Sequence, residues 1–307
     1  MSPALSFEGV FPILATPFDA DQNPDYESFR RMIRFMADTG VHGVTILGVL
    51  GEANRLLDGE RQRLIRSAVE AAAGNILVIV GTSHSGTRAA CELSRMAEDL
   101  GASAVMVTPH AEAVPNEDRV AEYFAAIAAA IKVPIVAQDH PASSGVQMSV
   151  NLLLRLVREL PAIACIKEEA LPTPPKIRAL IAGMTVRKVP ILTGLGALYG
   201  LFDLEAGSNG FNTGFAFPEV LMAMHTAAKA GDWSRARELY TRFLPLIVFE
   251  QQPGVAVRKE ILRLRGLIAT ATVRHPALNL PVTTAQQLKQ LLDVTLPGQD
   301  ITRPIEI

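Results

Sequence analysis

Lys167 directly follows a short apolar run, residues 163–166, and precedes two carboxylates, Glu168 and Glu169. If the run is a buried strand, the amine lies at or just inside the end of that strand. Desolvation there disfavours the ammonium and frees the neutral amine to attack a carbonyl group. The alternative is a lysine paired with Glu168 or Glu169 on a solvated loop, and its position alone leaves both interpretations open.

Two glycines three residues apart follow another apolar run. Gly48 and Gly51 flank Val49 and Leu50, and Glu52 comes next. Backbone N–H groups in such a loop can approach a carboxylate closely, although glycines after strands also form ordinary tight turns. Other polar residues also follow apolar runs, and each of them has a structural alternative. They are His110, Gln138, Asp139, His140 and Asn212.

Composition limits the class of protein. The chain has 307 residues, of which 49% are hydrophobic and 20% charged, with a net charge of −2. It can therefore bury a large core, and it shows neither a nucleic-acid footprint nor a basic membrane stripe. Cys91 and Cys165 lack the spacing of a disulfide framework or a metal site. Without a signal peptide or an apolar run long enough for a membrane span, we expect a cytoplasmic protein.

Short apolar runs alternate with longer amphipathic segments eight times in about the first 230 residues. Strands separated by helices predict a parallel sheet, and eight such units over about 250 residues favour a (β/α)₈ TIM barrel over an open doubly wound sheet. The expected strands are 10–15, 44–47, 76–80, 104–107, 134–137, 163–166, 190–193 and 209–212. The expected helices are 26–38, 58–73, 87–100, 117–131, 150–160, 175–182 and 197–205.

The last part of the chain has helical spacing and no strand candidates. Four helices are expected, at 217–229, 233–249, 255–265 and 284–292. We therefore predict that residues 1–230 form the catalytic barrel and that residues 231–307 form a helical extension packed on it. In a barrel of this kind chemistry takes place at the carboxyl ends of the strands, where Lys167 is expected.

Four short motifs occur in the order found in one known family. They are residues 9–12 with 16–18, the loop 48–52, residues 107–109 and residues 166–168. With these motifs the chain resembles the dihydrodipicolinate synthase / N-acetylneuraminate lyase family of class I aldolases over most of its length. The resemblance implies a lyase in which Lys167 forms a Schiff base with a 2-oxo acid.

The chain departs from the family pattern where carboxylates and protons are handled. Val49 and Leu50 replace the hydroxyl residues, one or two in number, that hold the substrate carboxylate. Gln138 replaces a proton-carrying tyrosine, and an amide cannot act as an acid or base near neutral pH. His110 replaces a second tyrosine, and Ser143 stands where dihydrodipicolinate synthases have an arginine for the second carboxylate. These differences argue against dihydrodipicolinate synthase activity but not against the Schiff base.

Two further segments resemble a branch of the family that dehydrates 2-keto-3-deoxy sugar acids. Residues 137–141 are similar to that branch at the end of the fifth strand, and residues 244–251 are similar in a C-terminal helix that we expect to serve packing only. The resemblance therefore favours a 2-keto-3-deoxy sugar acid dehydratase. The alternatives are a pyruvate-dependent class I aldolase, which cleaves a carbon–carbon bond, and a non-catalytic 2-oxo acid binding protein.

The expected roles follow from this mechanism. Lys167 forms an iminium with the substrate, and Gln138 orients the C2 oxygen or a water molecule. His110 and His140 are the candidates for acid–base work, because histidine titrates nearest neutral pH, with Glu169 a weaker candidate and the substrate carboxylate another possible base. The predicted substrate-binding residues are Gly48, Val49, Leu50, Gly51 and Asn212. The mechanism requires no metal and no organic cofactor, and the family resemblance implies a homotetramer or homodimer.

Overall fold

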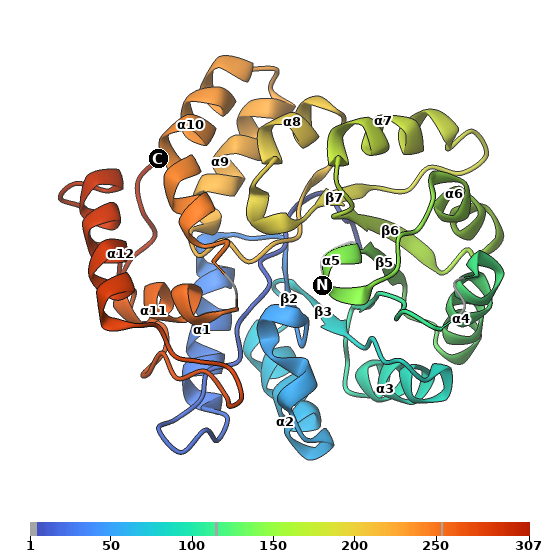
Figure 1. Ribbon diagram of the computed structural model, residues 1–307, viewed down its shortest axis with the longest axis horizontal. Coiled ribbons are helices and arrows are strands. Elements are labelled where there is room, and N and C mark those ends of the chain that lie inside the picture. The colour runs from blue at the N-terminus through green and yellow to red at the C-terminus, as the bar shows by residue number, and fades with distance from the viewer. Residues whose placement is uncertain (1–4, 114–115, 253) are drawn as a thin grey trace.

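Eight short parallel strands form the centre of the molecule (Figure 1). The computed structural model describes residues 5–113, 116–252 and 254–307. The strands lie in the order β1-β8-β7-β6-β5-β4-β3-β2, and a parallel bridge between Ile13 and Thr45 joins the two edges. The strands are β1 (Gly9–Val10), β2 (Gly43–Ile46), β3 (Leu77–Gly81), β4 (Ala104–Val107), β5 (Ile135–Asp139), β6 (Ile163–Glu168), β7 (Ile191–Thr193) and β8 (Gly210–Phe211).

Helices alternate with these strands and surround them. The predicted (β/α)₈ TIM barrel with C-terminal helices is therefore confirmed. The helices of the barrel layer are α1 (Tyr26–Thr39), α2 (Asp58–Ala72), α3 (Thr87–Asp99), α4 (Glu117–Ala130), α6 (Val150–Glu159), α7 (Thr173–Gly183), α8 (Gly200–Glu205) and α9 (Pro218–Lys229). Short turns lie in the loops, namely η1 (Val49–Gly51), η2 (Ala53–Arg55), α5 (Pro141–Ser144) and η3 (Leu195–Ala197).

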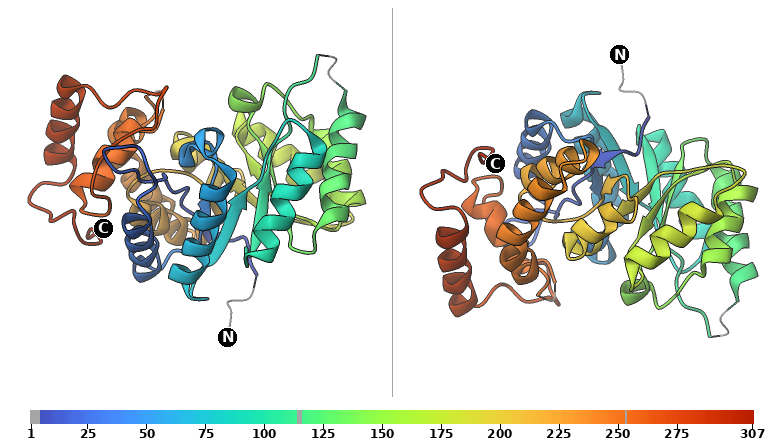
Figure 2. Two further views of the ribbon diagram at one scale, coloured as in Figure 1. Left: turned by 90° about the horizontal axis from the view of Figure 1, so that it is seen from below. Right: turned by 90° about the horizontal axis from the view of Figure 1, so that it is seen from above.

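The C-terminal helices pack on one side of the barrel (Figure 2). They are α10 (Trp233–Phe249), α11 (Ala256–Leu264) and α12 (Val282–Thr295). The longest of them, α10, packs against α9, and Arg31 of α1 donates to the carbonyl of Leu267 after α11, at 3.1 Å. The division of the chain into two parts at residue 230 stays a prediction. Among the described residues, no helix combines the length and the apolar character that crossing a membrane requires.

The strands differ from the predicted ones at their ends. Strands β5 and β6 run two residues further than expected, so Lys167 lies within β6 rather than after it. It is paired with Gln138 of β5 and with Leu192 of β7. The first strand is regular only over Gly9–Val10, because Pro12 accepts a hydrogen bond from Thr45 but has no N–H to donate to β2.

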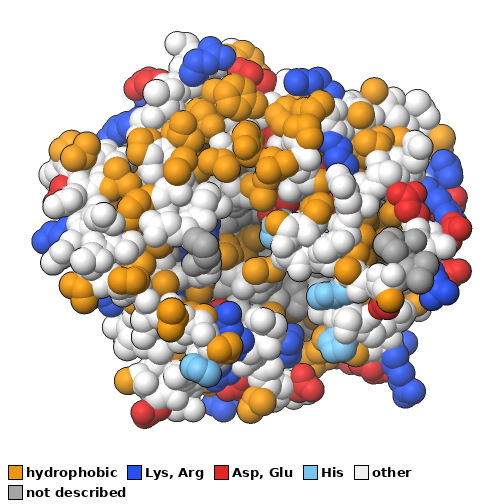
Figure 3. Space-filling model, viewed as in Figure 1, with side chains coloured by type: hydrophobic (Ala, Val, Ile, Leu, Met, Phe, Trp, Pro, Cys, Tyr) orange, Lys and Arg blue, Asp and Glu red, His pale blue; other side chains and the backbone are white. Residues whose placement is uncertain are grey.

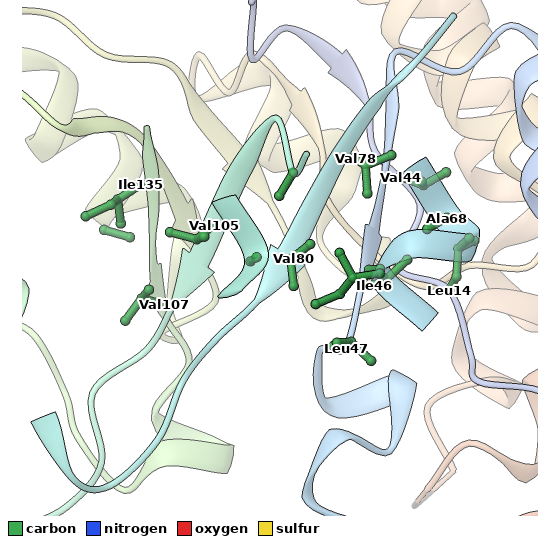
Figure 4. Packing of buried hydrophobic residues seen from close by; sticks show 14 of the residues in the cluster. Leu14, Val44, Ile46, Leu47, Ala68, Val78, Val80, Val105, Val107 and Ile135 are labelled. Carbon is green, nitrogen blue, oxygen red and sulfur yellow. The ribbon is translucent and has the colours of Figure 1, made fainter. Parts of the chain in front are cut away.

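Alternation along the strands separates an inner from an outer set of side chains. The inner cluster fills the barrel and consists of Phe7, Phe11, Leu77, Ile79, Ala104, Met106, Val136, Cys165 and Leu192. The outer set packs against the helix layer, as Val44 and Ile46 of β2 do beside Ala68 of α2 in Figure 4. Because Gln138 and Lys167 lie two residues beyond Val136 and Cys165, both point into the barrel at its carboxyl end.

Candidate active site

Lys167 lies inside the barrel beside a carboxylate. Its side chain is 1% exposed, and its Nζ atom is 3.1 Å from Oε2 of Glu169, which is 6% exposed. The side chain of Glu169 fits because residue 194 is glycine. A Cβ atom at Gly194 would lie 2.1 Å from Oε1 of Glu169. The lysine therefore does pair with a glutamate, as the alternative interpretation supposed, but within the barrel and not on a solvated loop.

Two hydrogen bonds fix the orientation of Glu169. Nε2 of Gln138 donates to Oε2 at 2.7 Å, and the backbone N–H of Leu195 donates to Oε1 at 3.0 Å. Burial raises the pKa of this carboxyl, but Lys167, His140 and these two donors outweigh it and hold the pKa below its usual range. Glu169 is thus an ionised, oriented carboxylate at the bottom of the site.

Lys167 has a lowered pKa because burial disfavours its ammonium form, and the nearby Glu169 opposes that shift. His140 follows β5 and is linked to the hydroxyl of Ser143 through Nδ1 at 2.6 Å. Burial lowers the pKa of its imidazole, which Glu169 partly counteracts. The site therefore combines a lysine that loses its proton readily, a fixed carboxylate and a neutral histidine.

Three further polar side chains face the interior near the carboxyl ends of the strands. Asn212 is fully buried, and its Nδ2 donates to the hydroxyl of Thr45 at 2.8 Å. Its Oδ1 atom has no hydrogen-bond partner among the described residues, and neither has the hydroxyl of Thr108. Buried polar atoms without partners are costly, so these two atoms are available to a bound polar molecule.

The loop after β2 forms a single turn of 3₁₀ helix, η1. The N–H groups of Gly51 and Glu52 close this turn by donating to the carbonyls of Gly48 and Val49, and the hydroxyl of Thr16 donates to the carbonyl of Gly51. The N–H groups of Val49 and Leu50 donate to no described residue. The side chain of Leu50 lies over Gly214, where a Cβ atom would be 2.1 Å from its Cδ1. Two adjacent N–H groups of the turn are therefore free to bind an anion.

The carboxyl ends of the strands surround an open hollow. Helix α5, which follows β5, lies near the centre of Figure 1, and Figure 3 shows from the same side that the surface is hollowed there. His110 lies mostly exposed on the loop after β4, and the partial desolvation of its ring and the neighbouring His84 lower its pKa. Among the described residues no hydrogen bond or ion pair joins His110 to Lys167. In contrast, Gln138 donates to Glu169, and His140 lies near enough to the Lys167–Glu169 pair for both charges to affect its pKa.

A second group of charges lies behind the strands, on the side of α7. Lys176 pairs with Asp139, donates to the carbonyl of Met148 at 2.8 Å, and lies 3.7 Å from Glu168. Burial and the adjacent Asp139 raise the pKa of Glu168 to about 8. These groups point away from the barrel interior and hold the ends of β5 and β6, which carry Gln138 and Lys167.

With this geometry established, the chain can be compared with known proteins. A model of the Dihydrodipicolinate synthetase family matches residues 6–295. The chain belongs to this family. Members of the dihydrodipicolinate synthetase family are lyases of the class I type that act on small molecules, and this enzyme is therefore such a lyase.

Individual relatives cover nearly the whole chain. An L-2-keto-3-deoxyarabonate dehydratase of Azospirillum brasilense is 36% identical over 286 residues, which are 91% of this chain and 92% of that protein. A 4-hydroxy-tetrahydrodipicolinate synthase of Methanopyrus kandleri is 32% identical over 298 residues, which are 93% and 95% of the two chains. The crystal structure of a dihydrodipicolinate synthase from Rhodopseudomonas palustris has a TM-score of 0.90 at 34% identity, with 94% and 98% coverage.

Sequence reasoning missed part of this family member's site. Thr45 and Thr108 were not predicted, and Glu169 was ranked below the histidines. Alternation would have indicated Thr108, which lies two residues beyond the inward-facing Met106. The sequence allowed a pair between Lys167 and Glu169, but the burial of this pair within the barrel depends on the turn after β6 and on Gly194. The described residues contain no group of three or more acidic, histidine or cysteine side chains arranged for a metal ion.

Proposed function

We propose that this chain is a 2-keto-3-deoxy sugar acid dehydratase and that Lys167 binds the substrate as a Schiff base. The observation that carries the proposal is the Glu169 carboxylate, 3.1 Å from the amine of Lys167 and held by Gln138. A fixed base beside the covalent lysine fits removal of a proton from C3 of the bound substrate. The 36% identical L-2-keto-3-deoxyarabonate dehydratase supports the same reaction.

The chemistry begins with the neutral amine of Lys167. It attacks the C2 carbonyl, and loss of water gives an iminium that acidifies the C3 protons. Glu169 removes one of these protons, and the C4 hydroxyl leaves as water with the proton that Glu169 returns. A C3–C4 double bond forms, the iminium is hydrolysed, and the carbon chain stays whole.

Gln138 serves as an orienting group in this scheme. An amide has no proton to exchange near neutral pH, and its Nε2 atom already donates to Glu169. A family member with a tyrosine at this position has a proton carrier there. In this chain the carboxylate that Gln138 holds takes over that work, so Glu169 ranks above His110 and His140 as the acid–base group.

The two ends of the substrate have matching partners. The free N–H groups of Val49 and Leu50 fit the C1 carboxylate. The unpaired Oδ1 atom of Asn212 and the hydroxyl of Thr108 fit polar groups of a sugar acid, because a hydrogen bond there relieves their cost of burial. A substrate with hydroxyl groups satisfies these atoms, whereas pyruvate alone does not.

Borohydride trapping tests the proposal. The protein is incubated with a 2-keto-3-deoxy sugar acid, reduced, and weighed intact by mass spectrometry. We expect one adduct, absent from Lys167→Ala. The product is then identified by NMR. In a reaction without borohydride, a product that has lost one water and keeps all the carbons of the substrate supports dehydration. The absence of any adduct in the wild-type protein overturns the Schiff base.

Two other outcomes correspond to the alternative functions. Release of pyruvate identifies an aldolase. The 32% identity to a 4-hydroxy-tetrahydrodipicolinate synthase supports this alternative. A ligand that raises the melting temperature without adduct or turnover identifies a 2-oxo acid binding protein. We also propose that the chain forms a homotetramer or homodimer, since family members are usually oligomeric, and light scattering measures this directly.

A further inference from the structure

The glutamate that ends the glycine loop is buried in an unusual conformation. Glu52 is 1% exposed, and its backbone φ is 54°, in the left-handed region that a residue with a side chain seldom adopts. It lies between the short turns η1 and η2, two residues after the second of the N–H groups assigned to the substrate carboxylate. Such a conformation costs of order 1 kcal/mol and persists only where other contacts hold it.

The contacts that hold Glu52 come mainly from the C-terminal extension. Its Oε1 atom lies 2.5 Å from Nζ of Lys259 on α11. Its Oε2 atom accepts hydrogen bonds from the backbone N–H of Arg274, at 3.0 Å, and from the side chain of Arg55, at 2.8 Å. Two of these three partners, Lys259 and Arg274, therefore belong to residues 231–307, the predicted helical extension.

Lys259 has further contacts besides Glu52. It is fully buried, donates to the carbonyl of Thr272 at 2.7 Å, and lies 4.3 Å from the centre of the Phe18 ring. Arg274 lies over the same ring at 4.5 Å and forms two hydrogen bonds with Glu60 of α2, at 2.6 and 2.7 Å. The extension thus holds the loop through a largely buried ionic cluster and not through a surface contact.

We propose that Lys259 is a positioning residue for the substrate carboxylate, acting through Glu52 on the turn that presents the N–H groups of Val49 and Leu50. The proposal rests on the proposed function, because it takes that turn to be the carboxylate site. It assigns to the C-terminal extension a part in substrate affinity. Because Lys259 touches neither Lys167 nor Glu169 through any described contact, its loss weakens binding and leaves the covalent step intact.

The test compares Lys259→Met with the wild-type enzyme by trapping pyruvate with borohydride over a range of concentrations. We expect the half-saturating concentration to rise about tenfold or more, which corresponds to about 1.4 kcal/mol. The amount of adduct at saturation stays the same. Glu52→Gln is the second variant, because it removes the charge and keeps the shape of the side chain, and we expect it to shift the half-saturating concentration in the same direction.

The matched control is Arg265→Met. Arg265 is also a fully buried cation of the extension and is paired with Glu219 of α9, but no described contact joins it to the glycine loop. We expect it to lower the melting temperature without changing the half-saturating concentration. An unchanged value in Lys259→Met, or an equal rise in the Arg265 control, overturns the positioning role.

A second measurement separates this inference from the proposed function. Calorimetry measures the dissociation constant of pyruvate in Lys167→Ala, with and without Lys259→Met, where no adduct can form. If the wild-type enzyme gives no adduct but Lys259→Met still weakens this binding, the Schiff base is wrong and the positioning role stands. If the adduct forms and neither measurement responds to Lys259→Met, the positioning role is wrong and the proposed function stands.

Discussion

Burial and a neighbouring carboxylate act on Lys167 in opposite directions. Burial lowers the pKa of the amine, and Glu169 at 3.1 Å raises it. A fully charged pair in a closed interior costs several kcal/mol of desolvation. Transfer of the Lys167 proton to Glu169 therefore costs little free energy. Forming an iminium with the substrate fixes a positive charge at this position, and Glu169 is already placed to stabilise it.

Glu169→Gln separates capture of the substrate from its turnover. The amide keeps the shape of the side chain but cannot accept the C3 proton. We expect borohydride trapping to proceed, while dehydration falls by about 10²–10⁴-fold, the usual contribution of general acid–base catalysis. Exchange of the C3 protons of bound pyruvate with deuterium, followed by NMR, should fall in parallel. Turnover at the wild-type rate would show that the base is another group.

Gly194→Ala tests the same carboxylate from its other side. The new Cβ atom would lie 2.1 Å from Oε1 and 2.3 Å from Cδ of Glu169, so the carboxylate must move. We expect turnover to fall about as far as in Glu169→Gln. Gly59→Ala is the control, since it lies in the first turn of α2 and its Cβ atom would meet nothing within 4 Å. Equal activity of both alanine variants would contradict the importance of the position of Glu169.

At the scale of elements, the strand–helix order could be predicted from the sequence, but the strand ends could not. The apolar runs of β5 and β6 stop at Ala137 and Ile166, while the backbone ladder continues to Asp139 and Glu168. The carboxyl end of a barrel strand carries polar side chains because it lies at the site, so the apolar pattern that predicts a strand ends before the strand does. This extension of β6 by two residues decides whether Lys167 lies on a loop or inside the barrel.

The contacts of residues 244–251 with loops near the site could not be predicted from the sequence either. Packing was the expected role for this segment, and most of it lies within α10. Its last two residues do more. Glu250 accepts from the backbone N–H of Ala216 after β8 at 3.2 Å, and Gln251 lies against Gly196 after β7. The loops involved follow strands that border the site, and helical periodicity alone carries no information on such contacts.

The end of α6 is held by one arginine. The guanidinium of Arg187, in the loop before β7, donates to the carbonyls of Val157, Leu160, Pro161 and Ile163 at 2.6–3.2 Å. We expect Arg187→Met to lower the free energy of unfolding by about 1–3 kcal/mol, because it leaves several carbonyls without a donor. Urea unfolding measures this, and Lys188→Met, at the exposed neighbouring residue, is the control. Activity at low urea should be unchanged in both variants.

At the scale of the whole molecule, the extension and the barrel share buried charges. Lys259 pairs with Glu52 and Arg265 with Glu219 across the boundary. Arg258 pairs with Glu250 within the extension, at 3.2 Å, and donates to the carbonyl of Gly214 in the barrel at 2.9 Å. Such pairs are weak sources of stability, because desolvation offsets their attraction. They do make the stability of the fold depend on pH, since burial has shifted the pKa values of several of their members.

Glu250 provides the clearest case. Burial raises the pKa of its carboxyl from 4.5 to about 7, against the attraction of Arg258. The native state therefore binds more protons than the unfolded state between about pH 4.5 and 7, and its stability falls as the pH rises through that window. The shift corresponds to roughly 3 kcal/mol. Glu168 and Asp203, with pKa values raised to about 8 and about 6, act in the same direction.

Histidines with lowered pKa values, such as His140 and His225, act in the opposite direction over the same range, so the effect of Glu250 is read from a comparison of two proteins. We therefore expect Glu250→Gln to gain stability relative to the wild-type protein as the pH rises from 5 to 7.5. The amide resembles the protonated carboxyl, so the variant should match the wild-type protein near pH 5 and exceed it near pH 7.5. Calorimetric melting at several pH values measures both curves. If the difference in melting temperature between the two proteins does not change with pH, Glu250 is ionised throughout the range, and the attraction of Arg258 outweighs the cost of burial.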